Sequence, residues 1–383
     1  MKIQIITSSY PANSNDPSGT AGLFVQEFAR QLVLLGHEVI VQPVSRKKKY
    51  KSERGIKVIP IPWSGGDQEL ASISFKNPIN YFIIFKFLFL GIKSTKDVAK
   101  KYHTDRVLAM WLIPSGFFAL IIFKLLKIPY DTWALGSDIW RISKVPFIGK
   151  PIIKLIAKHS SNLMADGIKL SKDVEFISHK KCFFLPSARL MPPKLKKSGV
   201  TDGLIFKLIF VGRYHVNKGP DLLIDAISLL EEESKKIIHL EMYGMGPLKE
   251  KMIKMVKDRG LNQTITIRDQ IDINRLSKKI QEKNFLIIPS RIESVPVIFS
   301  DSIQMSTPVI VTPVGDLPYL IQKYNCGMCS SELSPASIAG TIKLAMNKNR
   351  SDFESGIVKA QLDFDIHKIA QKWIGYSTDH RVK

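Results

Sequence analysis

The sequence predicts an α/β protein built from two domains, each with a parallel β-sheet. Short apolar runs rich in β-branched residues alternate with longer helical stretches along most of the chain, as strands and helices do in sheets covered on both faces. The alternation stops at a Pro-, Lys- and Gly-rich passage over 189–203 and then restarts. A chain of 383 residues also suits two domains of roughly 100–200 residues each.

The first half alternates between strand-length and helix-length segments. The expected strands are Ile3–Thr7, Glu38–Val44, Lys57–Pro62, Arg106–Trp111, Asp131–Leu135 and Lys181–Leu185. The expected helices are Gly22–Leu35, Asn80–Lys101, Ser115–Lys127 and Phe147–His159. This pattern predicts a Rossmann-like N-terminal domain over residues 1–190.

The second half repeats the pattern after a linker at 191–203, where adjacent prolines and later glycines break regular structure. The expected strands are Lys207–Val211, His239–Tyr243, Thr264–Ile267, Phe285–Pro289 and Val309–Thr312. The expected helices are Gly219–Leu230, Leu248–Arg259, Ile273–Glu282 and Val297–Met305. We expect a second Rossmann-like domain over 204–365 and a C-terminal helix over 366–383 that packs back on the first domain. Ligands of such sheets bind beyond the carboxyl ends of the strands, so the active site is expected in a cleft between the domains.

The chain is strongly basic, with 56 Lys and Arg residues against 34 Asp and Glu, a formal net charge of +22. Such a charge favours a negatively charged partner: nucleic acid, an anionic membrane surface or a phosphorylated substrate. A basic surface that only aids solubility is the simpler alternative. The segment Arg46–Lys51 and the aromatic run Tyr81–Phe89 favour docking on an anionic membrane.

Three cysteines point to a reducing compartment without a disulfide framework. Cys326 and Cys329 have C-x-x-C spacing, but no second pair accompanies them, so we expect no metal. The N-terminus reads as a first strand rather than a signal peptide. The apolar segments Tyr81–Ile92 and Leu108–Ile128 are respectively too short and too interrupted to span a bilayer. A soluble or peripheral protein is expected.

Two loops at strand ends carry glycine or cationic residues suited to phosphate. Gly19 and Gly22 precede the first helix, where glycines let backbone amides approach a ligand. Arg213 and Lys218 fall on the loop after Lys207–Val211 and are both able to clamp a diphosphate. The alternative for Arg213 and Lys218 is a pair of solvated loop cations, and the alternative for Gly19 and Gly22 is that they are ordinary glycines before a helix. Gly244 begins a third loop, Gly-Met-Gly-Pro, which suits a tight turn before a helix.

The passage Pro289–Gly315 carries Glu293 and Asp301 in an otherwise apolar context. Pro296 suits the first position of a helix, where its missing N–H costs nothing. The free amides of Val297 and Ile298 would then form an anion site at the helix N-terminus. The two carboxylates are suited to vicinal hydroxyls, such as those of a sugar or ribose.

These motifs resemble those of the retaining glycosyltransferases of family 4, also called glycosyl transferases group 1, which have the GT-B fold. Glu293-x7-Asp301 resembles the E-x7-E motif of that family. Further matches are Val211-Gly-Arg, Lys218-Gly, Gly244-Met-Gly-Pro-Leu and Thr307-Pro-Val-Ile-Val-Thr-Pro-Val-Gly in the second half, and Gly22-Leu-Phe-Val-Gln-Glu, Gly36-His-Glu-Val and Gly136-Ser-Asp-Ile in the first.

The resemblance implies a nucleotide-sugar donor held by the second domain, an acceptor held by the first, and no required metal or other cofactor. It implies that Arg213 and Lys218 contact the diphosphate, Glu293 the donor sugar and Asp301 the ribose hydroxyls. Gly19 and Gly22 would border the donor phosphates.

By the same resemblance, Asp138 would contact the acceptor or the transferring sugar. The chain departs from the family pattern in three places. Glu293 is followed by Ser-Val-Pro instead of Gly-Phe-Gly, Asp301 replaces a glutamate, and Tyr319 stands near a position where glutamate is frequent. These differences put the identity of the sugar in question.

The sequence thus predicts a retaining hexosyltransferase that acts on a glycan or lipid-linked acceptor in cell-surface polysaccharide synthesis, including lipopolysaccharide or exopolysaccharide. It would work in the cytoplasm or on the inner face of the plasma membrane. A nucleotide-sugar epimerase of the same fold is an alternative, distinguished by turnover of donor without acceptor. A charge-driven nucleic-acid-binding protein is a second alternative, but no aromatic–basic recognition module appears.

Overall fold

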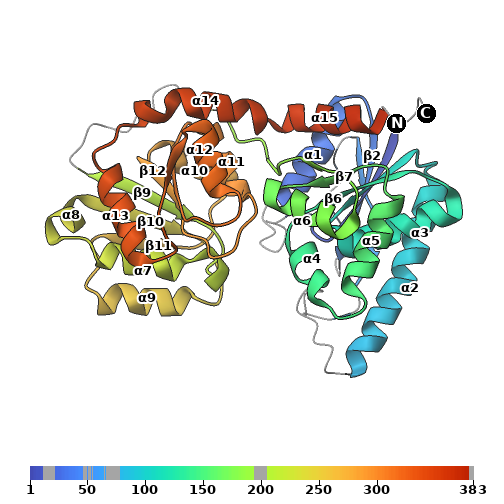
Figure 1. The fold of residues 1–383 in the computed structure, drawn as a ribbon, viewed down its shortest axis with the longest axis horizontal. Coiled ribbons are helices and arrows are strands. Elements are labelled where there is room, and N and C mark those ends of the chain that lie inside the picture. Colours follow the sequence, from blue (N-terminus) through green and yellow to red (C-terminus); the bar gives the residue numbers. More distant parts are fainter. Residues whose placement is uncertain are drawn as a thin grey trace. The chain divides into compact units, whose positions relative to one another are not determined.

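The computed structural model describes residues 1–11, 22–45, 50, 53, 55–63, 65, 78–193 and 205–378. The chain divides into an N-terminal unit, Met1–Leu185 with Ile369–Lys383, and a C-terminal unit, Pro186–Lys368. Figure 1 shows both as α/β units. The Arg46–Lys49 part of the basic segment, Gly19 and most of the 191–203 passage lie outside the described residues.

The N-terminal unit is built on a parallel sheet with the order β3-β2-β1-β5-β6-β7-β8, and β4 pairs with β2. Its strands are β1 (Lys2–Thr7), β2 (Glu38–Ser45), β3 (Ile56–Val58), β4 (Ile61–Pro62), β5 (Arg106–Met110), β6 (Tyr130–Ala134), β7 (Leu163–Ala165) and β8 (Cys182–Phe184). Its helices are α1 (Leu23–Leu34), α2 (Pro78–Lys101), α3 (Phe117–Leu126), α4 (Ser137–Trp140), α5 (Gly149–His159) and α6 (Ile168–Ser178), with short turns η3 (Leu112–Gly116) and η4 (Ile142–Lys144).

The core of this unit lies in the central strands and the helices over them. The side chains of Ile5, Val107 and Trp133 on β1, β5 and β6 are fully buried, as expected for strands covered on both faces. The predicted strand over Lys57–Pro62 is divided into β3 and β4. The three-residue strand β7 was not predicted, because so short a run has no periodicity of its own.

The C-terminal unit has a second parallel sheet, with the order β11-β10-β9-β12-β13-β14. Its strands are β9 (Phe206–Val211), β10 (Ile238–Tyr243), β11 (Ile265–Arg268), β12 (Phe285–Ile288), β13 (Val309–Val311) and β14 (Gly327–Cys329). Its helices are α7 (Pro220–Ser228), α8 (Glu232–Ile237), α9 (Lys249–Asp258), α10 (Ile273–Gln281), α11 (Val297–Gln304), α12 (Leu317–Tyr324), α13 (Pro335–Ala345) and α14 (Glu354–Asp363), with short turns η5 (Val216–Lys218) and η6 (Arg350–Phe353).

The chain re-enters the N-terminal unit along its last helix, α15 (Ile366–Thr378), which lies beside α1 in Figure 1. Trp373 is fully buried and its ring lies 5.9 Å from that of Phe28 on α1, edge to face. Tyr376 stacks on Phe183 of β8 at 4.5 Å. Buried aromatic rings supply much of the packing energy of a core, so α15 is an integral part of this unit.

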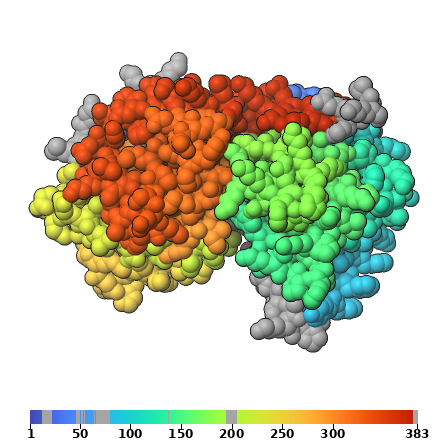
Figure 2. Space-filling model, in the orientation of Figure 1, coloured from blue at the N-terminus to red at the C-terminus, as the bar shows by residue number. Residues whose placement is uncertain are grey.

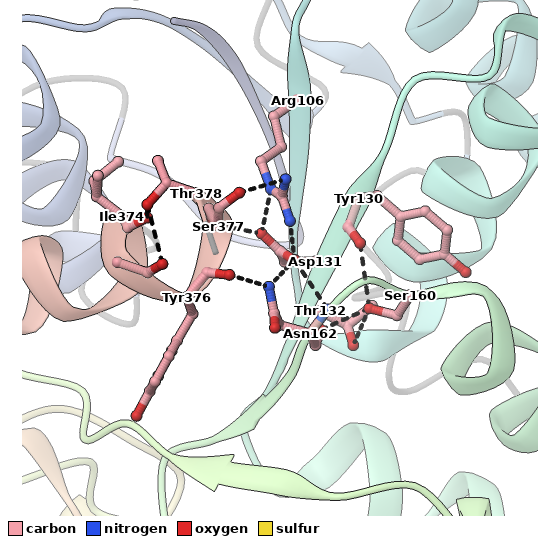
Figure 3. Close-up of polar contacts among 11 residues, drawn as sticks. Arg106, Tyr130, Asp131, Thr132, Ser160, Asn162, Ile374, Tyr376, Ser377 and Thr378 are labelled. Atoms are coloured by element: carbon pink, nitrogen blue, oxygen red, sulfur yellow. Dashed lines mark hydrogen bonds and ion pairs between the residues drawn. The ribbon is translucent and has the colours of Figure 1, made fainter. Parts of the chain in front are cut away.

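A buried polar network fastens the end of α15 (Figure 3). Asp131 on β6 accepts two hydrogen bonds from the guanidinium of Arg106 on β5, at 2.7 and 2.8 Å. It also accepts one from Ser377 Oγ at 2.9 Å, while Arg106 donates to the Ser377 carbonyl at 2.9 Å. Asn162 bridges Asp131 Oδ1 to the Tyr376 carbonyl. The buried ion pair therefore has the additional partners that such a pair requires.

A candidate diphosphate site at the switch point of the C-terminal sheet

The strand order of the C-terminal unit defines one candidate position for a ligand. The chain passes from β9 to β10 on one side of β9, and β12 later takes the other side. All these strands are parallel, but the order in which the chain adds them to the sheet reverses between β9 and β12. Ligands of open parallel sheets bind outside the carboxyl ends of the strands at such a switch point. The loops that follow these two strands, 212–219 and 289–296, carry Arg213, Lys218 and Glu293.

These two loops are fastened to each other by Arg291. Its backbone N–H donates to the Asn217 carbonyl at 2.8 Å, and its guanidinium donates to the Val216 carbonyl at 2.7 Å. The same guanidinium binds both carboxylate oxygens of Asp221, at 2.8 and 2.9 Å. Burial tends to raise the pKa of Asp221, but the hydrogen bond and charge of Arg291 outweigh it, so the pKa is lowered. A bidentate pair fixes geometry as well as adding energy, so the loops are held in one arrangement.

A glycine allows the close approach of the two loops. Gly219 has a φ of +66°, and a Cβ atom there would lie 1.9 Å from the carbonyl oxygen of Pro289. Both the left-handed backbone and the missing space restrict this position to glycine. Pro220 follows as the first residue of α7, so the chain turns sharply from the loop into the helix.

Lys218 and Glu293 meet across the two loops. The Lys218 ammonium donates a hydrogen bond to Glu293 Oε2, and Ser290 Oγ lies 3.3 Å from the same oxygen. An ammonium group has three protons to donate, so Lys218 keeps donors for a further acceptor. The backbone of Glu293 is supported by Gly315 in the loop after β13, where a Cβ atom would lie 2.1 Å from the Glu293 carbonyl oxygen.

Arg213 stands on the loop that begins with Gly212 and is exposed. Among the described residues its guanidinium has no hydrogen-bond or ion-pair partner. The next residue, Tyr214, is buried, and its hydroxyl lies 2.7 Å from the Met242 carbonyl and 2.6 Å from the Arg268 carbonyl. Gly244 gives this loop room, because a Cβ atom there would lie 1.9 Å from the Gly212 carbonyl oxygen. The buried Tyr214 thus anchors the loop next to Arg213, whose guanidinium is exposed to solvent.

The amino end of α11 follows Glu293 after three residues. Pro296 is the N-cap, with extended backbone and no side-chain acceptor, rather than the first helical residue that the sequence predicted. Phe299 N–H bonds to the Pro296 carbonyl at 2.9 Å. The first amides of a helix have no acceptor within it, so the N–H groups of the half-buried Val297 and Ile298 are available to a ligand, and their binding of an anion stays a prediction.

The structure corrects the role expected for Asp301. Its side chain is fully buried, and its carboxylate accepts hydrogen bonds from Arg189 at 2.6, 3.0 and 3.2 Å. Gln304, one turn further along α11, donates to the Arg189 carbonyl at 2.7 Å. Asp301 therefore ties the first segment of the C-terminal unit to α11 and does not present its oxygens to ribose hydroxyls.

Two further predicted residues lie in the N-terminal unit. Asp138 in the first turn of α4 is buried, and its two oxygens accept hydrogen bonds from the backbone N–H groups of Leu112, at 2.5 Å, and Leu135, at 3.1 Å. Burial raises its pKa to about 6 against the lowering effect of these bonds. This carboxylate joins the loops after β5 and β6, which corrects the expected contact with acceptor or sugar. Gly22 is required for packing, because a Cβ atom would lie 2.6 Å from the backbone of Ser9 and Tyr10.

Sequence reasoning missed Asp221 and Arg291, which hold the two loops together, and Arg189, which pairs with Asp301. Asp221 and Arg291 each lie within three residues of a predicted site residue, and opposite charges beside two motifs that meet at a switch point could have indicated the pair. Arg189 carried no such signal, because its partner lies 112 residues away in the chain.

The arrangement is suited to a diphosphate that carries a polyol. The side chains of Arg213 and Lys218 and the first amides of α11 are groups that bind phosphate oxygens. Glu293 lies beside Lys218 and can accept hydrogen bonds from hydroxyl groups. Within the described parts of the chain, no group of three or more His, Cys, Asp or Glu residues is placed to hold a metal ion. Among the helices that the structure describes, none is both long and apolar enough to cross a membrane.

Comparisons with known proteins agree with the fold. Residues 194–358 match the family model described as glycosyl transferases group 1. A Bacillus subtilis protein named for teichuronic acid biosynthesis is 22% identical over 363 residues, covering 85% of this chain and 84% of the relative.

Among solved structures, sucrose-phosphate synthase from Thermosynechococcus elongatus has a TM-score of 0.76 at 15% identity, with full coverage of both chains. Anabaena HepE in complex with UDP has a TM-score of 0.74 at 13% identity, covering 99% of this chain and 100% of the other. At these identities the likeness shows the fold alone, and that fold is GT-B. The predicted fold class is therefore confirmed, while the cleft between the domains stays a prediction.

Proposed function

We propose that this chain, whose residues 194–358 match the family model of glycosyl transferases group 1, is a retaining hexosyltransferase. It moves a sugar from a nucleoside diphosphate sugar to a glycan or lipid-linked acceptor. The observation that carries the proposal is the meeting of Lys218 and Glu293 at the switch point of the C-terminal sheet, where one cation suited to phosphate and one carboxylate suited to hydroxyls are hydrogen-bonded together.

The donor diphosphate binds where positive charge and helix-end amides converge. Arg213 and Lys218 contact its oxygens from the loop after β9, and the amides of Val297 and Ile298 contact them from α11. As the bond from the sugar to the diphosphate breaks, negative charge grows on the leaving oxygen. Donors fixed in advance stabilise such charge most effectively, and the loss of one typically costs on the order of 100- to 1,000-fold in rate.

Retention follows if the acceptor hydroxyl attacks from the side that the leaving group occupies. The acceptor oxygen forms the new bond to the anomeric carbon, and the bond to the diphosphate breaks. The departing phosphate oxygen takes the proton of the acceptor hydroxyl. This sequence of bond changes needs no metal and no protein nucleophile, and it relies on the cations that hold the diphosphate.

Glu293 orients the transferred sugar, because its Oε2 lies at the ion pair with Lys218 and therefore next to the diphosphate. Its position is supported from behind by Gly315. Asp301 has no part in donor binding, since Arg189 holds its carboxylate in the interior. The ribose hydroxyls are accordingly assigned to other groups.

The biological setting we propose is the synthesis of a cell-surface polysaccharide on the cytoplasmic side of the membrane. The relative named for teichuronic acid biosynthesis supports this setting by its likeness over most of both chains. The free cysteines of the described chain, Cys182, Cys326 and Cys329, agree with a reducing compartment.

A panel of nucleoside diphosphate sugars tests the proposal. We expect at least one sugar nucleotide to raise the melting temperature and to be consumed when an acceptor is added, with the anomeric configuration of the product checked by NMR. Arg213→Ala should weaken binding of that nucleotide, while Arg275→Ala, an exposed arginine on α10, should not.

Three results would reject parts of this proposal. Full donor affinity in Arg213→Ala would contradict the diphosphate assignment. Turnover of the donor without acceptor, with epimerisation of the sugar, would identify an epimerase instead. Binding to nucleic acid with steep salt dependence, and no response to any sugar nucleotide, would remove the transferase function altogether.

A further inference from the structure

Helix α2 in the N-terminal unit exposes an aromatic stripe to solvent. Phe82, Phe85 and Phe89 are 67%, 68% and 62% exposed, and their spacing of three and four residues places them on one side of the helix. Figure 2 shows part of this helix (light blue) at the surface of the N-terminal unit. Large apolar side chains are rarely grouped in this way on a soluble surface unless they bind something.

The opposite side of α2 packs closely against α3 and Trp63, so the exposure of the stripe does not result from loose packing of the helix. Phe87 is 1% exposed, and its ring lies 5.5 Å from that of Phe118 on α3 and 5.2 Å from that of Trp63. At Gly91 a Cβ atom would lie 2.4 Å from the Phe118 ring, so the helix approaches α3 as closely as a glycine permits. The helix therefore presents its aromatic stripe in a fixed direction.

The same stripe continues as positive charge toward the end of the helix. Lys93, Lys96 and Lys100 follow Phe82 and Phe89 at helical spacing, and Phe82 and Lys100 lie about 27 Å apart along the axis at 1.5 Å per residue. Lys86 stands among the aromatic residues. Asp97 is the one acidic residue of α2, so the exposed side of this helix is apolar at its start and cationic at its end.

A second exposed apolar group lies in the loop before α5. Phe147 is 96% exposed and Ile148 is 67% exposed, and Lys144 and Lys150 flank them. Figure 1 shows this region of the chain toward the same end of the N-terminal unit as the start of α2. Between residues 78 and 165 the sequence has thirteen Lys and Arg residues, four Asp and no Glu, so basic charge surrounds both groups.

From these observations we propose that α2, with Phe147 and Ile148, docks the N-terminal unit on the surface of an anionic lipid bilayer. The aromatic rings enter the boundary between headgroups and acyl chains, where interfacial helices bury their apolar side. The lysines bind lipid phosphates, and each basic residue near such a surface contributes about 1 kcal/mol. This binding goes beyond sugar transfer and does not depend on it.

The charge pattern favours a lipid surface over a protein partner or a second copy of the chain. A bilayer of anionic lipids offers both a continuous negative surface for the lysines and an apolar interior for the rings. A second copy would bring the same basic charge against itself, since the surroundings of the stripe carry almost no acidic residues, and like charges placed together are unfavourable.

Sedimentation of the full-length protein with lipid vesicles tests this proposal. We expect binding to vesicles of phosphatidylcholine mixed with phosphatidylglycerol and little binding to phosphatidylcholine alone. A triple variant, Phe82→Ser with Phe85→Ser and Phe89→Ser, should reduce the bound fraction strongly. Phe176→Ser is the matched control, because Phe176 on α6 is 77% exposed outside this surface and its loss should leave binding unchanged.

A second variant tests whether vesicle binding depends on the lysines of α2 or only on the net charge of the protein. Lys93→Glu with Lys96→Glu and Lys100→Glu should weaken binding to the anionic vesicles by about tenfold or more. The same charge change in the C-terminal unit, at the exposed Lys251, Lys257 and Lys348, should have a smaller effect. All variants should keep the melting temperature of the natural protein and its response to sugar nucleotides, which separates this test from that of the transferase function.

Two outcomes would overturn the proposal. Equal binding of the aromatic variant and the natural protein to anionic vesicles would show that α2 does not enter the bilayer. Absence of vesicle binding, together with a dimer that the aromatic variant converts to a monomer, would identify the stripe as an interface between two copies of the chain.

Discussion

Lys218 and Glu293 form an ion pair between the loops that leave β9 and β12, on the two sides of the switch point in the C-terminal sheet. The side chains are 33% and 13% exposed, so the pair is reachable from solvent yet partly sheltered. The contact sets a cation and an acid side by side, and the proposed reaction requires them to act on adjacent parts of one donor.

The first prediction separates the tasks of these two residues. Lys218→Ala should lower the rate of sugar transfer by roughly 100- to 1,000-fold, because one fixed donor to the leaving diphosphate is lost. Glu293→Gln should retain affinity for the nucleoside diphosphate and lose turnover, because its contact is with the sugar. Steady-state kinetics and nucleotide titrations measure both effects.

A control for the first prediction comes from the ion pair of Lys343 and Glu231, which is exposed on the surface of the same unit. Lys343→Ala should change neither rate nor affinity, since such a pair contributes little even to stability. Unchanged transfer in Lys218→Ala would contradict the assignment of this lysine to the diphosphate.

The second prediction concerns the close contact of Gly219 with Pro289. Gly219→Ala should weaken nucleotide binding and lower the melting temperature, because the added methyl group pushes the two site loops apart. Gly260→Ala is the matched control: Gly260 has the same φ of +66° and open space around its Cβ position. That control should cost only the left-handed backbone strain of about 1–2 kcal/mol, measured by urea unfolding, and leave nucleotide affinity intact.

The third prediction distinguishes a structural Asp301 from one that binds ribose. Asp301→Ala leaves the buried guanidinium of Arg189 unpaired, and breaking one partner of a buried pair typically costs about 3–5 kcal/mol. Replacing both, as Arg189→Met with Asp301→Leu, should restore much of that stability. Urea unfolding of the single and double variants measures the coupling. A variant at Asp301 with normal stability and lowered nucleotide affinity would restore the ribose assignment.

The fourth prediction is a pH dependence that originates from Asp138. Burial raises its folded-state pKa to about 6 from the ordinary value of 3.8, so between these values the folded protein binds more protons than the unfolded one. Stability from this group therefore falls as pH rises from about 4 to 6, by up to about 3 kcal/mol. Unfolding free energies of the natural protein and of Asp138→Asn, compared across this range, should differ by an amount that changes with pH.

A carboxylate on the surface provides the comparison for this pH series. Asp97→Asn on the exposed side of α2 should leave the pH dependence of the natural protein unchanged. A constant difference in stability between Asp138→Asn and the natural protein from pH 4 to 6 would show that Asp138 does not titrate in this window.

The alternation of apolar runs and helices determined the fold class and most of the elements. β9, β10 and β12 lie within one residue of their predicted bounds, because strands buried on both faces need continuous apolar sequence. The prediction failed for the three-residue strands β7 and β14 and placed Pro296 one residue too far into α11, since such short features depend on neighbours rather than on local pattern.

The sequence by itself determined that two parallel α/β domains form and that Arg213, Lys218 and Glu293 stand on loops at strand ends, because periodicity and glycine placement are local properties. The order of strands around β9 was decided by tertiary structure alone, and that order brings Lys218 to Glu293 and Arg291 to Asp221. Tertiary structure also took Asp138 and Asp301 into the interior. The partners that make a buried carboxylate stable come from distant parts of the chain, and no local spacing identifies them.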